Sequence, residues 1–152
     1  HPARRKFLQR SAPRHRRAAP TTAGCPEGMR RGAKPDDSWI DQELVQSASR
    51  LHELGHAHSI EAWQDGELAG GLYGVAIGGA FFGESMFHRV TDASKVALCG
   101  LVERLQKKKC LLLDTQWLTP HLEQFGCVEI PRNDYLRLLA RAVELPRSFA
   151  DL

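Results

Sequence analysis

The chain has 152 residues, of which 42% are hydrophobic, enough for one ordinary hydrophobic core but not for two separate large domains. No apolar run approaches 18 residues, so we expect neither a membrane span nor a signal-peptide core, but a cytoplasmic protein. The charge is uneven. Residues 1–35 carry ten Lys or Arg against one acid (net +9), whereas residues 36–152 carry eleven against seventeen (net −6).

Residues 1–35 are the basic part of the sequence, and we expect them to be a poorly ordered N-terminal arm or remnant. Residues 11–35 mix Pro, Gly, Arg and Ala without an apolar period, so they cannot bury enough surface to offset the entropy of ordering. A basic arm on an acidic body suits a polyanionic partner such as nucleic acid, but a plain disordered arm or fragment end explains the composition equally well. Residues 36–152 are expected to form the folded domain.

The first regular pattern predicts a helix and three strands. Apolar residues at helical spacing follow a cap at Asp37-Ser38 and stop at Gly55. Strands are then expected over residues 56–64, 67–77 and 80–87, because two-residue turn signals, Asp65-Gly66 and Gly78-Gly79, separate them. These strands should form an antiparallel meander.

The second half of the sequence predicts alternating helices and strands. A long helix begins at Asp92 or Ser94 and ends in the Lys107–Lys109 run, and an apolar strand over residues 110–114 follows it. A short helix (119–125), a strand (127–130) and a helix starting at Pro131 complete the chain. The predicted fold is α+β, a mixed, mostly antiparallel sheet flanked by helices, close to the acetyltransferase (GNAT-like) architecture.

Glycines interrupt the second predicted strand in the segment Gly70-Gly71-Leu72-Tyr73-Gly74. Three glycines in five residues weaken a strand, so they indicate either a close approach to its backbone or a local bend.

An acid occupies an apolar segment in the third predicted strand. Glu84 is flanked by three phenylalanines and a methionine in FFGESMF (81–87). An acid in such surroundings is costly unless a cation meets it. The cation could belong to a structural salt bridge, with Arg89 or Lys95 as candidates, or to a ligand.

Polar residues follow the apolar strand that ends near residue 114. Asp114-Thr115-Gln116 would lie where the buried strand opens, a common location for sites. Strand alternation predicts that Asp114 and Gln116 point to the same side. Alternatively, Asp114 caps the next helix.

Cysteines and histidines give no metal signature. The four cysteines are scattered without CxxC spacing, and His56 and His58 have no third ligand at suitable spacing. We therefore expect no metal site and no disulfide framework.

Residues from Trp39 to Pro146 resemble leucyl/phenylalanyl-tRNA–protein transferases, through GGLYG (70–74), FFGESMF (81–87), DASK (92–95) and DTQ (114–116). The resemblance implies an aminoacyltransferase that moves Leu or Phe, with Met as a further donor residue, from aminoacyl-tRNA to the α-amine of proteins with N-terminal Arg or Lys. It implies a role in the N-end-rule degradation pathway, a monomer, and no metal or coenzyme. Residues 1–35 do not resemble the family's usual N-terminal domain.

The resemblance also implies a role for each site residue. Asp114 and Gln116 would be catalytic: Gln116 positions the acceptor amine and the ester, and Asp114 assists proton removal or orients a relay. Glu84 would meet the positive side chain of the acceptor. The apolar pocket for the transferred side chain would be lined by Leu72, Phe81, Met86, Leu98, Leu101 and Leu113.

Two other functions fit parts of the sequence. One is a non-catalytic module that binds basic N-termini and keeps Glu84. The other is an acyl-CoA-dependent GNAT acetyltransferase, which would need a glycine-containing pyrophosphate loop before the long helix. Residues 88–94 contain no glycine, which argues against it.

Overall fold

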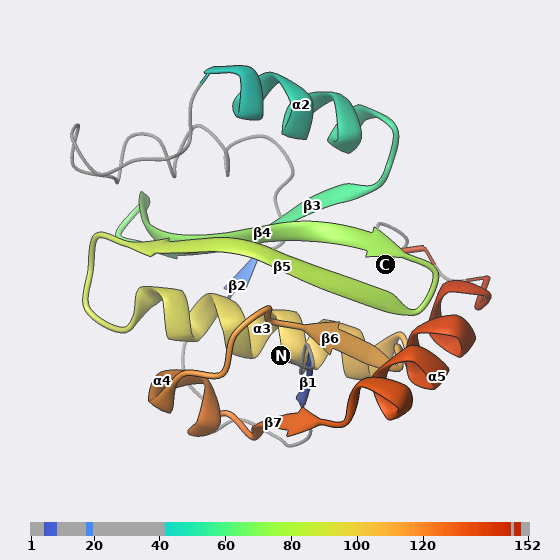
Figure 1. The fold of residues 1–152 in the computed structure, drawn as a ribbon. Coiled ribbons are helices and arrows are strands. Elements are labelled where there is room, and N and C mark those ends of the chain that lie inside the picture. Colours follow the sequence, from blue (N-terminus) through green and yellow to red (C-terminus); the bar gives the residue numbers. More distant parts are fainter. Residues whose placement is uncertain (1–4, 9–17, 20–41, 147, 150–152) are drawn as a thin grey trace. The chain divides into compact units, whose positions relative to one another are not determined.

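The computed structural model describes residues 5–8, 18–19, 42–146 and 148–149. Its elements alternate much as the sequence predicts (Figure 1). They are β1 (Arg5–Leu8), β2 (Ala18–Ala19), α2 (Gln42–Glu53), β3 (Ala57–Gln64), β4 (Glu67–Ile77), β5 (Ala80–His88), α3 (Ala93–Lys107), β6 (Leu112–Asp114), α4 (Pro120–Glu123), β7 (Cys127–Ile130) and α5 (Arg132–Val143).

Five strands form one sheet in the order β2-β3-β4-β5-β6, and β1 pairs with β7 in a second, two-stranded sheet. β3, β4 and β5 are joined by tight turns, as antiparallel neighbours can be, whereas β6 lies parallel to β5. At the turn between β3 and β4, Asp65 (φ 53°) and Gly66 (φ 82°) both adopt positive φ, the geometry of a type I′ hairpin. The predicted α+β class, with its mixed and mostly antiparallel sheet, is confirmed.

Two short strands form in the segment for which the sequence predicts poor order. β1 pairs antiparallel with β7, from Arg5 opposite Ile130 to Leu8 opposite Cys127, and β2 pairs antiparallel with β3. The composition of residues 1–35 predicts neither strand, because the backbone partners come from distant parts of the chain. The remainder of residues 1–35, like the predicted cap at Asp37-Ser38, lies outside the described residues.

The chain divides into two compact units, and β4, β5 and α3 each pass from one to the other. Unit 1 comprises residues 1–13, 75–84 and 102–152, and unit 2 comprises residues 14–74 and 85–101.

In unit 2, helix α2 packs on the central strands through Ala48, which contacts Tyr73 of β4. Leu44, Val45 and Phe87 surround this pair. Two histidines brace the connection from α2 to β3: His52 Nδ1 lies 2.7 Å from the Ala57 carbonyl oxygen and His58 Nε2 2.8 Å from that of Gly55.

The glycine-rich stretch of β4 permits a close approach, as predicted, but by the protein itself. A Cβ atom on Gly70 would lie 2.7 Å from Ala93 Cβ and 2.9 Å from the Phe87 carbonyl oxygen. The missing side chain therefore lets the start of α3 and strand β5 lie against the β4 backbone.

In unit 1, strands β5 and β6 share a core with α5. The buried residues of this core are Ala80, Leu112, Tyr135 and Ala142. Partly buried hydrophobic side chains, including Leu138 and Leu139 of α5, pack against them. This core anchors the β5–β6 pair at the point where the polar candidate residues begin. Among the described residues, no helix is both long and apolar enough to cross a lipid bilayer.

Candidate functional site

The candidate site lies in unit 1, where β6 ends beside β5. The two strands run parallel, with Phe82 opposite Asp114. A Cβ atom on Gly83 would lie 3.4 Å from the Asp114 carbonyl oxygen, an ordinary van der Waals contact, so the two backbones are neighbours here. β6 stops at Asp114, and two residues later Gln116 adopts a left-handed conformation with φ 64°.

Gln116 makes three hydrogen bonds, one to Asp114 at the end of β6 and two to β5. Its backbone N–H donates to Asp114 Oδ1 at 2.8 Å. Its side-chain Nε2 donates to the Gly83 carbonyl oxygen at 3.0 Å and to Glu84 Oε2 at 3.4 Å. A left-handed conformation costs a non-glycine residue about 1–2 kcal/mol, and these bonds offset that cost. The Gln116 amide is thus exposed to solvent but held in a defined position.

Asp114 is the buried support of this turn. Its side chain and that of Tyr135 are each 3% exposed, and the Tyr135 hydroxyl donates to Asp114 Oδ2 at 2.9 Å. One carboxylate oxygen therefore accepts from the Gln116 backbone and the other from α5. A buried carboxylate needs such partners, because its desolvation is otherwise uncompensated.

Tyr135 is the site residue that sequence reasoning missed. It lies 21 residues beyond Asp114, in a helix predicted only from its apolar spacing. A usable signal was present, since a tyrosine on the apolar side of a helix must find a partner for its hydroxyl, and Asp114 ends a buried strand.

The sequence prediction that Asp114 and Gln116 point to the same side assumed that both lie in one strand, and this assumption was wrong. Strand alternation ends at Asp114, so the side-chain period of two does not reach Gln116. Nor does Asp114 cap the next helix. Thr119 is the N-cap of α4, and its hydroxyl accepts the Leu122 N–H at 3.2 Å.

Glu84 lies at the exposed edge of the same cluster. Partial burial raises the pKa of its carboxyl, the hydrogen bond from Gln116 acts in the opposite sense, and the nearby charge of Asp114 adds to the rise. Within the described part of unit 1, no Lys or Arg pairs with Glu84. Lys95, one of the cations considered for it, pairs with Asp92 at 2.5 Å.

The predicted pocket residues divide between the two units. In unit 1, Phe81 and Leu113 are opposite each other on β5 and β6, and both are buried. In unit 2, Met86 is exposed, with 37% of its surface accessible. The other three, all buried in unit 2, are Leu72, Leu98 and Leu101.

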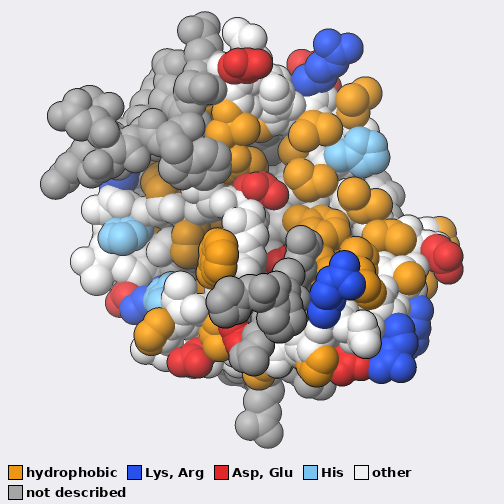
Figure 2. Space-filling view, viewed as in Figure 1, with side chains coloured by type: hydrophobic (Ala, Val, Ile, Leu, Met, Phe, Trp, Pro, Cys, Tyr) orange, Lys and Arg blue, Asp and Glu red, His pale blue; other side chains and the backbone are white. Residues whose placement is uncertain are grey.

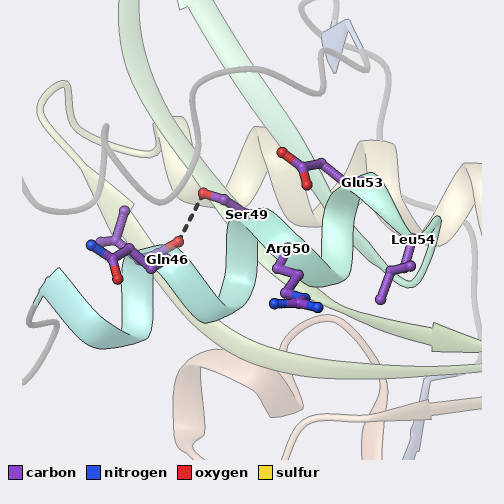
Figure 3. Close-up of a pocket in the computed structure, with 6 residues that line it drawn as sticks. Gln46, Ser49, Arg50, Glu53 and Leu54 are labelled. Carbon is purple, nitrogen blue, oxygen red and sulfur yellow. Dashed lines mark hydrogen bonds between the residues drawn. The ribbon is translucent and has the colours of Figure 1, made fainter.

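A groove along α2 is a separate surface feature (Figure 3). All its lining residues come from this one helix and its end, and none belongs to the predicted site: Val45, Gln46, Ser49, Arg50, Glu53 and Leu54. The Ser49 hydroxyl donates to the Val45 carbonyl oxygen at 2.8 Å, so its hydrogen-bond partner lies within the same helix.

The described residues contain no group of three His, Cys, Asp or Glu side chains that could hold a metal ion. On the face shown in Figure 2, Lys and Arg side chains lie in separate small groups, with hydrophobic side chains exposed between them. The strongly basic segment of the sequence lies mostly outside the described residues.

Comparison with known proteins gives a consistent result. The family described as leucyl/phenylalanyl-tRNA protein transferase matches residues 14–140. Among curated relatives, the leucyl/phenylalanyl-tRNA–protein transferase of Akkermansia muciniphila is 56% identical over 111 residues, covering 73% of this chain and 58% of the relative. That of Rhodopseudomonas palustris is 56% identical over 117 residues (77% and 52%), and that of Herpetosiphon aurantiacus 53% identical over 123 residues (81% and 64%).

The chain thus spans about half to just under two thirds of the length of these relatives. Among solved structures, AAC(6')-Iy in complex with a CoA bisubstrate analogue matches with a TM-score of 0.49 and 16% identity, covering 91% of this chain and 96% of the other.

Proposed function

Because this chain belongs to the leucyl/phenylalanyl-tRNA protein transferase family, we propose that it transfers Leu or Phe from aminoacyl-tRNA to the α-amine of an acceptor protein. The proposed acceptors begin with Arg or Lys, and Met is a further proposed donor residue. The product would carry a new N-terminal residue that marks it for the N-end-rule pathway. We propose that the protein acts in the cytoplasm as a monomer.

The observation that carries this proposal is the position of the Gln116 amide. Its Nε2 donates to Gly83 and Glu84, and we propose that its Oε1 accepts a hydrogen bond from the incoming α-amine. An amide oxygen fixed in this way can accept a hydrogen bond from the attacking α-amine and orient the nitrogen toward the ester. Orientation suffices for much of the rate, because an aminoacyl ester is already activated.

The reaction is an exchange of one acyl bond for another. The amine nitrogen bonds to the aminoacyl carbonyl carbon, the ester bond breaks, and the tRNA ribose oxygen leaves as a hydroxyl. The amine must lose a proton in this step, and its reference pKa of about 7.7–8.0 leaves a fraction of it already neutral near pH 7. We propose that Asp114 acts through Gln116 rather than as a base, because both its oxygens already accept hydrogen bonds.

Glu84 is the proposed reader of the acceptor. Its carboxylate lies at an exposed edge, 3.4 Å from the Gln116 amide nitrogen, so one acceptor residue could place its amine at Gln116 and its cationic side chain at Glu84. A charge-assisted bond to Lys or Arg would favour the ionised carboxylate and offset the partial burial that raises its pKa.

The transferred side chain would be held by the predicted apolar residues. In unit 1 these are Phe81 and Leu113, which lie opposite each other on β5 and β6 and are both buried. Full burial of a Leu or Phe side chain favours binding by roughly 1.5–3 kcal/mol, enough to prefer it to Ala.

The test combines this chain with phenylalanyl-tRNA or leucyl-tRNA and a peptide that begins with Arg. We expect Phe or Leu to be joined to that peptide, and not to the same peptide with an acetylated α-amine. Gln116→Ala should lower kcat about 100-fold, the order of effect of losing one positioned hydrogen-bonding group. Gln124→Ala, which changes an exposed glutamine at the end of α4, is the matched control and should transfer normally.

Peptide binding without transfer would overturn the proposal and leave a module that binds basic N-termini. Acetyl transfer from acetyl-CoA to the same peptide would instead identify an acetyltransferase. Equal loss of activity in Gln116→Ala and Gln124→Ala would remove the assigned role of Gln116.

A further inference from the structure

The segment that follows α5 places an aromatic ring against the predicted pocket residue Phe81. Phe149 is 7% exposed, and its ring centroid lies 5.0 Å from that of Phe81 at an interplanar angle of 35°. Phe81 itself is completely buried. Because both residues belong to unit 1, this contact is part of one compact body.

Arg104 of α3 fixes Phe149 in this position. Its Nε and one terminal nitrogen both donate to the Phe149 carbonyl oxygen, at 3.0 and 2.5 Å, and its guanidinium carbon lies 4.7 Å from the centre of the Phe149 ring. Directly after the end of α3, Lys108 Nζ donates to the Ser148 carbonyl oxygen at 2.6 Å. Residues 148 and 149 are therefore attached to α3 by charged donors and by ring contacts at once.

Arg104 is also an unusual side chain to find at this location. Only 9% of it is exposed, and burial lowers the pKa of its guanidinium. A buried cation is costly unless it is well hydrogen-bonded, and the Phe149 carbonyl oxygen accepts two such bonds from it. The forked bond to Phe149 and the contact with its ring hold Arg104 and Phe149 together as a structural clamp.

We propose that Phe149, clamped by Arg104, is the positioning residue that sets where the Phe81 ring lies and thereby the depth of the pocket for the transferred side chain. This inference rests on the proposed function, which assigns Phe81 to that pocket. Phe149 acts through Phe81 and does not touch the donor. Its size would then be one determinant of the choice between Leu and Phe.

The physical basis is the close packing of protein interiors. Phe81 has no exposed surface, so its ring cannot retreat from a bulky ligand while Phe149 fills the space behind it. Phe149→Leu removes part of that support and lets Phe81 move back, which deepens the pocket. The larger Phe side chain should gain from this change, whereas Leu should be held less tightly.

The experiment compares two donors in parent and variant. We expect Phe149→Leu to raise the ratio of kcat/KM for phenylalanyl-tRNA to that for leucyl-tRNA about tenfold, the lower end of what one methylene changes in an apolar pocket. Arg104→Lys keeps the charge but loses the forked bond, and it should shift the ratio in the same direction by a smaller factor. Leu139→Ala, in the α5 core, is the control that lowers stability but should leave the ratio within about twofold.

Binding of phenylalanine methyl ester and leucine methyl ester, followed by NMR, gives a second readout that does not require transfer. If Phe149→Leu shifts the ratio of their Kd values in the same direction, the inference is supported even when the parent protein transfers nothing. Absence of transfer by the parent would reject the proposed function alone. The inference is overturned if Phe149→Leu reduces both donors by one factor, or if neither ester binds the parent.

Discussion

Replacing Tyr135 by Phe tests whether the buried bond to Asp114 supports the site. The change removes one hydroxyl from a pair in which both side chains are 3% exposed and the oxygens are 2.9 Å apart. A hydrogen bond to a charged group contributes about 1.5–3 kcal/mol, and the carboxylate oxygen left behind has no solvent to replace it. We therefore expect Tyr135→Phe to lower the free energy of unfolding by about 2 kcal/mol, equivalent to a Tm lower by about 4–8 °C for a chain of this size.

Urea unfolding followed by circular dichroism measures this loss, and a double-mutant cycle assigns its cause. In an Asp114→Ala background, the same tyrosine change should cost less than about 0.5 kcal/mol, because the acceptor is already gone. Asp134→Ala, one residue earlier on the exposed side of α5, removes a surface pair with Arg137 and should cost no more than about 1 kcal/mol. An equal cost of Tyr135→Phe with and without Asp114 would refute the hydrogen-bond explanation.

Two further predictions concern a turn and a titration. Gly78 has φ 55°, and a Cβ atom there would lie 2.5 Å from the Val143 carbonyl oxygen, so Gly78→Ala should lower the free energy of unfolding by at least about 2 kcal/mol in thermal unfolding. Gly66 has φ 82° but no atom within 4 Å of such a Cβ, so Gly66→Ala should lower it by only about 1 kcal/mol. If the two variants unfold alike, contact with the end of α5 is not what requires Gly78. Burial raises the pKa of Glu84, so as pH falls its carboxylate becomes protonated while the pH is still above the ordinary pKa of 4.5. KM for an Arg peptide should therefore rise in that pH range in the parent but not in Glu84→Gln. Parallel pH profiles of the two proteins would contradict this.

The sequence predicted the order of the elements well because their signals are local. The Asp65-Gly66 hairpin and the glycine that follows α2 are turn signals readable without any tertiary information. Strands β1 and β2 could not be found in this way. They depend on pairing with β7 and β3, and nothing in a basic, Pro- and Gly-containing segment indicates such partners.

The sequence pointed to three polar residues that the structure brings together, but it did not predict their geometry. Asp114, Gln116 and Glu84 do lie together, but strand alternation could not anticipate that Gln116 leaves the strand with φ 64° and reaches back to β5. Tyr135 was missed for a related reason, since its contact with Asp114 depends on how α5 packs against β6. Local sequence patterns therefore indicate which polar residues lie near a strand end. Tertiary packing determines which of their atoms form hydrogen bonds within the protein.

Burial separates the site into two kinds of residue, and that division determines how variants should be read. Gln116 and Glu84 are exposed, so changing them should remove the atoms assigned a function by the proposal with little effect on the core. Asp114 and Tyr135 are buried and, in the proposed mechanism, act through the position of Gln116, so changing them should lower stability and function together. A loss of activity in Asp114→Ala consequently says nothing about a proton acceptor by itself. Only a variant such as Tyr135→Phe, which leaves the carboxylate in place but loosens it, separates a positioning role from direct participation in proton transfer.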